Sequence, residues 1–81
     1  MTESINLTDR RLYLWIKHED IVFFQSNLEA EDGLARIRTE KQTDSESLIV
    51  MLFMASREKE VLSVIEHLQE AGIEIRFDVA R

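Results

Sequence analysis

The stretch from Ser47 to Ala55 contains the only long unbroken apolar run in the sequence, and it constrains the fold more than any other feature. Polar residues from Thr43 to Glu46 precede it, and Ser56 to Glu58, which are typical of a helix start, follow it. A run this short, with β-branched residues near its beginning, predicts a strand that is apolar on both faces. Such a strand lies in the middle of a sheet. We expect one of its faces to need a cover that no helix of this chain supplies.

Length and composition limit the chain to one small domain. A chain of 81 residues buries only about 60% of its unfolded surface, so a monomer has a marginal core. The absence of cysteine excludes a disulfide framework, a thiolate metal site and a cysteine nucleophile. Residues 1–6 lack the regions of a signal peptide, and no run approaches the ~20 apolar residues that cross a bilayer. We therefore expect a cytoplasmic protein with no membrane partner.

Strict alternation of apolar and polar residues predicts a first strand from Arg10 to Lys17. Its aliphatic side is expected to meet the core, which leaves Tyr13 and Trp15 on the other side. The period then changes near His18 to that of a helix, which ends near Glu31. The residues that share one face of this helix are Ile21, Phe24 and Leu28. Gly33 supplies the left-handed conformation that a helix C-terminus needs.

The same two periodicities, that of a strand and that of a helix, predict the remaining elements. Alternation predicts a second strand from Leu34 to Gln42, joined to the apolar strand by the polar turn at Thr43 to Glu46. Ser56 is expected to cap a second helix, which Gly72 ends. The buried stripe of this helix is Val61, Ile65 and Leu68. Alternation from Ile73 to Val79 predicts the last strand.

The order strand, helix, strand, strand, helix, strand predicts an α+β fold, the ferredoxin-like βαββαβ plait. Right-handed crossovers place both helices on one face of a four-stranded antiparallel sheet with strand order 4-1-3-2. We expect residues 10–81 to form this single domain and residues 1–9 to form a flexible N-terminal tail.

The helices leave the second face of the sheet uncovered, and its composition resembles an interface. On the central strand either Ile49, Met51 and Phe53 or the alternate set from Leu48 to Met54 points outward, and both sets are apolar. An apolar, aromatic centre inside a charged rim is typical of protein contacts. We therefore predict a homodimer that forms through this face or through an edge strand. The predicted interface residues are Tyr13, Trp15, Arg36, Arg38, Met51, Phe53 and Arg76.

No motif in the sequence indicates catalysis, and we expect no enzyme activity, no cofactor and no metal. His18 with Glu19 and Asp20 is better explained by the helix dipole than by a metal site. His67 has no matching ligand at a recognised spacing. Aromatic residues on central strands beside arginines also resemble the stacking platform of RNA-binding modules. The net charge of −6 and the absence of the glycine-aromatic pattern on the third strand oppose nucleic acid as a partner.

The chain resembles a family of small, uncharacterised bacterial proteins at several short motifs, and the resemblance implies a single ferredoxin-like domain with no assigned activity. These motifs are Asp20-Ile21, Leu28-Glu29-Ala30, Asp32-Gly33-Leu34-Ala35 and Arg38-Thr39. The arrangement is also similar to ACT-like regulatory domains, which implies pairing through sheets and amino-acid binding at the loop after the first strand. That loop usually carries a glycine, whereas Lys17 to Asp20 contains none.

These observations favour a non-catalytic interaction or regulatory module that self-associates. The alternative is an ACT-like domain that senses a small-molecule ligand such as an amino acid. The third reading is a module that binds single-stranded nucleic acid on the sheet face.

Overall fold

The structure is a computed structural model that describes residues 10–29 and 33–78. The expected tail at residues 1–9 lies outside the described residues. The elements, in chain order, are β1 (Arg10–Lys17), α1 (His18–Glu29), β2 (Arg36–Gln42), β3 (Glu46–Phe53), the short 3-10 turn η1 (Ala55–Arg57), α2 (Glu58–Glu70) and β4 (Ile75–Phe77).

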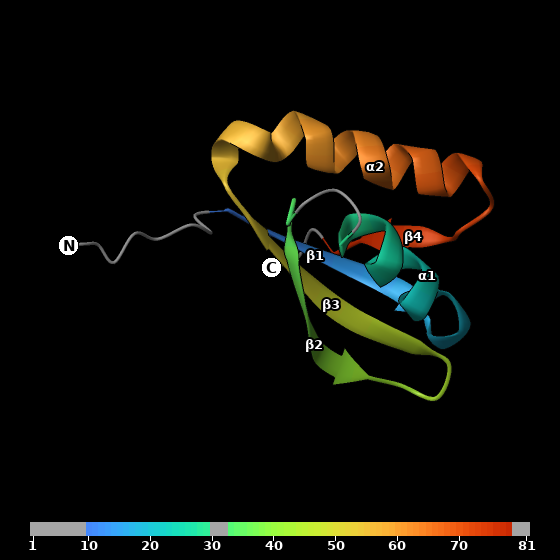
Figure 1. The fold of residues 1–81 in the computed structure, drawn as a ribbon. Coiled ribbons are helices and arrows are strands. Elements are labelled where there is room, and N and C mark those ends of the chain that lie inside the picture. Colours follow the sequence, from blue (N-terminus) through green and yellow to red (C-terminus); the bar gives the residue numbers. More distant parts are fainter. Residues whose placement is uncertain (1–9, 30–32, 79–81) are drawn as a thin grey trace.

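The four strands form one antiparallel sheet in the order β2-β3-β1-β4, with the apolar strand β3 and the first strand β1 in the centre. Both helices lie on the same side of this sheet (Figure 1). The predicted order 4-1-3-2 is this order counted from the other edge. The ferredoxin-like α+β plait is therefore confirmed.

The register between β1 and β3 determines which side of β3 faces the helices. Leu14 lies opposite Ile49, and Leu12 lies opposite Met51. Residues opposite each other in an antiparallel pair project to the same face, so Ile49 and Met51 join Leu14 in the core. Phe53, two residues on, takes the same side. All three belong to the hydrophobic core beneath the helices.

The prediction that Met51 and Phe53 lie on the uncovered face is therefore wrong. Met51 is 0% exposed and Phe53 is 2% exposed within the core. Both sets of alternate residues in β3 are apolar, so the sequence pattern does not distinguish them, and a shift of one residue exchanges the two faces. The uncovered side of β3 carries Leu48, Val50 and Leu52 instead.

The start of the second helix also differs from the prediction. Ser56 lies inside η1, and Arg57 occupies the N-cap position of α2 without a capping side-chain hydrogen bond. The end of the helix is as expected. Gly72 has a φ of 104°, its N–H donates to Gln69, and the N–H of Ile73 donates to Leu68. This pair of hydrogen bonds is a Schellman motif, which turns the chain back toward β4.

Neither α1 nor α2, the two α-helices in the part of the chain that is described, combines the length and apolarity needed to cross a membrane.

Candidate functional site: the open sheet face

The side of the sheet away from α1 and α2, called here the open sheet face, is built in cross-strand rows. Leu52 lies between Arg36 of β2 and Arg11 of β1, and Val50 lies between Arg38 and Tyr13. The next row contains Lys41, Leu48, Trp15 and Arg76. A register shift between Thr39 and Lys41 brings Lys41 into this row. Lys17 and Glu46 face each other at the end of the sheet.

The apolar centre of the open sheet face is already covered by side chains of the same sheet. Leu48 is 0% exposed and Val50 is 1% exposed, although no helix lies over them and neither belongs to the core cluster. Their cross-strand neighbours are aromatic or long and charged, and such neighbours lie within reach of one another on a pleated surface. Tyr13, Trp15 and Leu52 remain half-buried. The face therefore presents aromatic rings and arginine stems above a buried aliphatic layer.

Arg76 ties three strands of this face together. Its Nη2 donates to both carboxylate oxygens of Glu46 on β3, at 2.6 Å each. Trp15 on β1, the strand between β3 and β4, stands directly opposite Arg76, and the guanidinium carbon is 5.9 Å from the centroid of its ring. This distance is within the range of a cation–π contact. The ring of Trp15 is thus covered on one side by a group that an ion pair holds in place.

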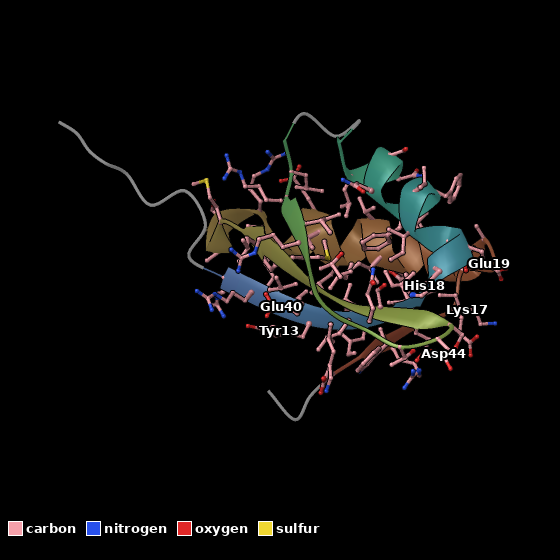
Figure 2. The ribbon with its side chains drawn as sticks, turned by 90° about the horizontal axis from the view of Figure 1, so that it is seen from below. Tyr13, Lys17, His18, Glu19, Glu40 and Asp44 are labelled. Carbon is pink, nitrogen blue, oxygen red and sulfur yellow. The ribbon has the colours of Figure 1, made fainter. Side chains whose placement is uncertain are left out.

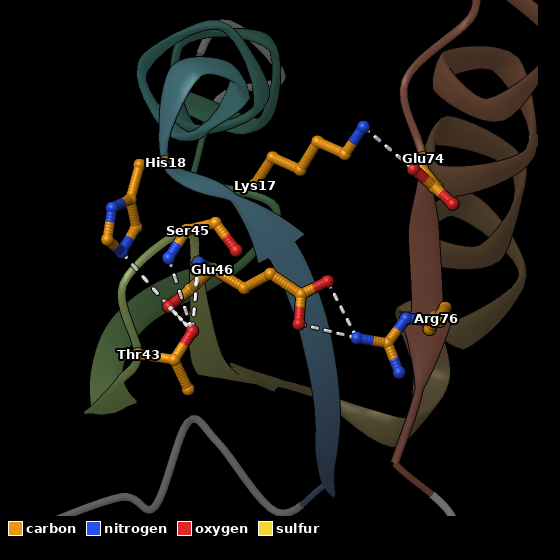
Figure 3. A network of polar contacts seen from close by, with 7 residues as sticks. All are labelled: Lys17, His18, Thr43, Ser45, Glu46, Glu74 and Arg76. Carbon is orange, nitrogen blue, oxygen red and sulfur yellow. Dashed lines mark hydrogen bonds and ion pairs between the residues drawn. The ribbon is translucent and has the colours of Figure 1, made fainter.

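A second polar cluster fixes the end of the sheet, where β1 passes directly into α1. His18 Nε2 lies 3.0 Å from the carbonyl oxygen of Glu46, so this nitrogen carries the hydrogen that it donates. The same carbonyl accepts from the N–H and the hydroxyl of Thr43, at 2.8 and 3.2 Å (Figure 3). Lys17 and His18 lie with Asp44 at this end of the sheet, away from Tyr13 (Figure 2). The start of α1 is thereby attached to the β2–β3 hairpin.

Charged partners raise the pKa of two cations on the face. Glu74 accepts a hydrogen bond from Lys17 at 3.0 Å, and this carboxylate raises the pKa of the Lys17 amine above its ordinary value. Glu46 likewise raises the pKa of the Arg76 guanidinium through its hydrogen bonds and its charge. Both side chains stay charged at neutral pH.

The open sheet face is rich in positive charge in an otherwise acidic chain. The chain has 10 lysine and arginine residues and a net charge of −6. The strands place six of these cations on the open sheet face, and three of them pair with carboxylates: Arg76 with Glu46, Arg38 with Glu40 and Lys17 with Glu74. The six cations are Arg11, Lys17, Arg36, Arg38, Lys41 and Arg76. Because so many cations share one face, the sheet side and the helix side differ strongly in charge.

Of the seven predicted interface residues, the structure brings five to the open sheet face. Tyr13 and Trp15 lie at its centre, Arg36 and Arg38 at the β2 edge, and Arg76 on β4. Met51 and Phe53 lie in the core instead. Leu48, Val50 and Leu52 belong to the alternate outward set of β3, and Arg11 to the outward side of β1, but none of the four was among the seven predicted interface residues. Lys41 and Glu46 were not predicted to lie on this face. The sequence pattern assigns Glu46 to the polar turn that begins at Thr43. In the structure Glu46 is instead the first residue of β3.

The described residues contain no group of three or more His, Cys, Asp or Glu side chains that could hold a metal ion. In particular, His18 is engaged with the hairpin backbone. The arrangement on the open sheet face is one of contacts and charge, which suits binding.

Residues 14–71 match a family described as Domain of unknown function (DUF4911), over well more than half of the chain. No curated protein matches the chain, and no solved structure matches it.

Proposed function

We propose that this chain, which belongs to the DUF4911 family, is a non-catalytic interaction module that self-associates through its open sheet face. One observation carries the proposal: both helices cover the same side of the sheet, while Tyr13 and Trp15 lie half-buried at the centre of the other side. Aromatic residues at the centre of a face with a charged border are typical of protein contacts.

The size of the face supports a modest dimer. Strands spaced about 4.8 Å apart, with eight residues each in β1 and β3, seven in β2 and three in β4 at about 3.3 Å per residue, give a footprint of roughly 400 Å². Side-chain relief increases this area, and a standard interface buries about 800 Å² per partner. The face is therefore near the lower limit for a stable contact, which favours a dimer that dissociates on dilution.

Charge favours one of the two possible twofold arrangements. A twofold axis parallel to the strands places β2 of one copy over β4 of its partner, whereas a perpendicular axis places β2 over its own copy. The first arrangement brings Arg38 into the row of the second copy in which Asp78 adjoins Tyr13, although it also sets Lys41 opposite Arg76. The second arrangement brings like charges together. We propose the first arrangement.

An ACT-like role in amino-acid sensing has less support. In that class the ligand loop lies between the first strand and the first helix. Here β1 ends at Lys17 and α1 begins at His18, so no connecting residue is left to form such a loop. We therefore place ACT-like sensing behind self-association.

Light scattering on a gel-filtration column tests the proposal over a range of protein concentrations. We expect the wild type to approach twice its 9.5 kDa mass as the concentration rises into the micromolar range. Trp15→Ala should shift the protein to the monomer, since central aromatic residues dominate contact energies. Phe23→Ala is the matched control, because Phe23 is an aromatic residue 52% exposed on the helix side.

A wild type that stays monomeric at all concentrations would refute the proposal. So would a dimer that persists in Trp15→Ala and dissociates in Phe23→Ala. Both variants should keep the far-ultraviolet circular dichroism of the wild type.

A further inference from the structure

Two adjoining hollows lie at the β2 edge of the sheet, and they share Arg36 and Leu52. The larger, of about 450 Å³ and called here the β2 hollow, is lined by Gln25, Ala35, Arg36, Ile37, Arg38 and Leu52. The smaller, of about 150 Å³, adds Arg57 and the backbone at Gly33 and Leu34. Leu52 also has Arg11 as its cross-strand neighbour on β1. Four arginines therefore surround one half-buried leucine.

The positive charge around the β2 hollow is only partly neutralised. Arg36 and Arg11 form no ion pair with any residue in the described part of the chain. Arg38 reaches Glu40 at 3.4 Å, with 66% of its side chain exposed, and exposed pairs of this kind hold each other weakly. None of the described residues that line the two hollows is a carboxylate. An anion that enters the β2 hollow meets Arg36 and the weakly paired Arg38, whereas Arg57 of the smaller hollow is held by Glu60.

Besides the two arginines, the β2 hollow is lined by the polar Gln25 and by three apolar residues. Of these, Leu52 lies on the same side of the sheet as the arginines, and Ile37, opposite Met51, faces the helix side. Ala35 is buried, and Ile37 and Leu52 are half-buried. A hollow of about 450 Å³ has the size of a small-molecule site, for which an apolar wall with a few placed polar groups is typical. Arginine forks match the paired oxygens of phosphates and carboxylates. A charged edge strand also discourages pairing with other strands, but that role requires no hollow.

We propose that the β2 hollow binds a small organic anion, with a phosphate or carboxylate group held by Arg36 and Arg38 and an apolar body against Leu52. This proposal does not rest on self-association. The hollow lies at the outermost strand, but Arg36 and Arg38 also belong to the proposed dimer contact, so the ligand binds the monomer and competes with a second copy for these two arginines.

Nuclear magnetic resonance on the full ¹⁵N-labelled chain tests the proposal with three probes: phenyl phosphate, benzoate and inorganic phosphate. We expect saturable amide shifts at Ala35 to Arg38 and at Leu52. Phenyl phosphate should bind more tightly than inorganic phosphate, because the phenyl ring contacts the apolar wall. Comparing phenyl phosphate with benzoate identifies which head group the arginines prefer.

Variants distinguish a specific binding site from nonspecific electrostatic attraction of an anion to positive charge. Replacing both arginines in Arg36→Gln/Arg38→Gln should weaken phenyl phosphate binding at least about tenfold, since charge-assisted hydrogen bonds are lost. Lys59→Gln removes one exposed positive charge from α2 and should leave binding unchanged. Circular dichroism of the same samples shows that folding is as in the wild type. All proteins are compared at a concentration at which the wild type is a monomer, because Arg36 and Arg38 also belong to the proposed dimer contact.

Several outcomes would overturn the proposal. They are no saturable shift with any probe, equal affinity for phenyl phosphate and inorganic phosphate, or equal weakening by Lys59→Gln and the double variant. Saturable binding of an oligothymidine strand, with none of the small anions bound, would overturn it in favour of a nucleic-acid surface. The titrations are made at protein concentrations at which the wild type is a monomer, so these results are distinguishable from failure of the proposed dimer.

Discussion

The two sides of β3 are equally buried but are covered in different ways. Ile49 and Met51 are fully buried beneath α1 and α2, and Leu48 and Val50 are fully buried on the opposite side, where no helix lies. On the helix side the cover consists of packed apolar side chains such as Phe24. On the open side it consists of aromatic rings and long charged side chains from neighbouring strands.

This difference separates what the fold requires from what a partner can use. A cover of packed side chains on rigid helices cannot be exchanged without unfolding the domain. A cover of arginine and lysine stems has many rotamers, and its charged ends stay in water. A partner can displace or extend such a cover at low cost. The open sheet face is thus closed in the isolated chain yet adaptable.

The largest expected effect comes from the same deletion on the two sides, Leu14→Ala and Leu48→Ala. Both leucines are 0% exposed, so the two deletions lose the same free energy of transfer of the removed side-chain atoms from water to the interior. We expect Leu14→Ala to lower the free energy of unfolding by about 3–5 kcal/mol and Leu48→Ala by roughly half as much. The reason is that Trp15 and Lys41 can move to fill the space at Leu48, whereas the helix side cannot relax. Urea denaturation at low protein concentration measures both values.

Equal losses in the two variants would contradict the idea of an adaptable cover. A chain of this size has about 4–12 kcal/mol of stability, so Leu14→Ala could fail to fold. If Leu14→Ala is unfolded while Leu48→Ala is folded, the loss of stability is again larger on the helix side, as predicted.

A smaller effect is expected when the polar cover of Trp15 is loosened. Arg76→Gln removes the cation over the ring and the two hydrogen bonds to Glu46. We expect a loss of stability well below that of Leu48→Ala, because the pair is exposed to solvent. Acrylamide quenching of tryptophan fluorescence should rise clearly, since Trp15 is the only tryptophan. Arg57→Gln, on the helix side, is the control and should leave quenching unchanged.

Sequence reasoning succeeded where one side of an element is polar. Alternation from Arg10 to Lys17 predicted β1 with its observed bounds, and the two glycines were correctly assigned to positive φ. It could not succeed for β3, because a strand apolar on both sides carries no alternation. Only the pairing of Leu14 with Ile49 decides which side faces the helices, and that pairing is a tertiary fact.

The candidate site was predictable to the same degree. The outward positions of Tyr13, Trp15, Arg36, Arg38 and Arg76 follow from alternation in half-polar strands. The rows that surround Leu52 with arginines do not, because they depend on the register of three strands. The shift that brings Lys41 opposite Leu48 is also invisible in the sequence, since Glu40 and Lys41 are equally polar.

The ion pairs on the two sides of the sheet can be compared by the pH dependence of the free energy of unfolding. On the sheet side the pair is Lys17 with Glu74. Glu74 raises the pKa of Lys17 above 10.5, so folding is favoured by the protonated amine. A raised pKa contributes stability that is fully present below the unfolded value and is lost as pH rises through the folded value. We expect Glu74→Gln to flatten the fall in stability above about pH 10. An unchanged alkaline limb in urea denaturation would show that the pair is not formed in solution.

The smallest effect is expected on the helix side, where Arg57 donates two hydrogen bonds to Glu60 at 2.9 and 3.1 Å. These bonds hold the pKa of the Glu60 carboxyl below its ordinary 4.5. A lowered pKa contributes stability above the unfolded value, which is lost as pH falls through the folded value. Carbon-detected titration should therefore show Glu60 protonating below pH 4.5, and Arg57→Gln should return its pKa toward 4.5. If Glu60 titrates alike in both proteins, the pair at the start of α2 is not formed in solution, and the helix side owes its stability to packing alone.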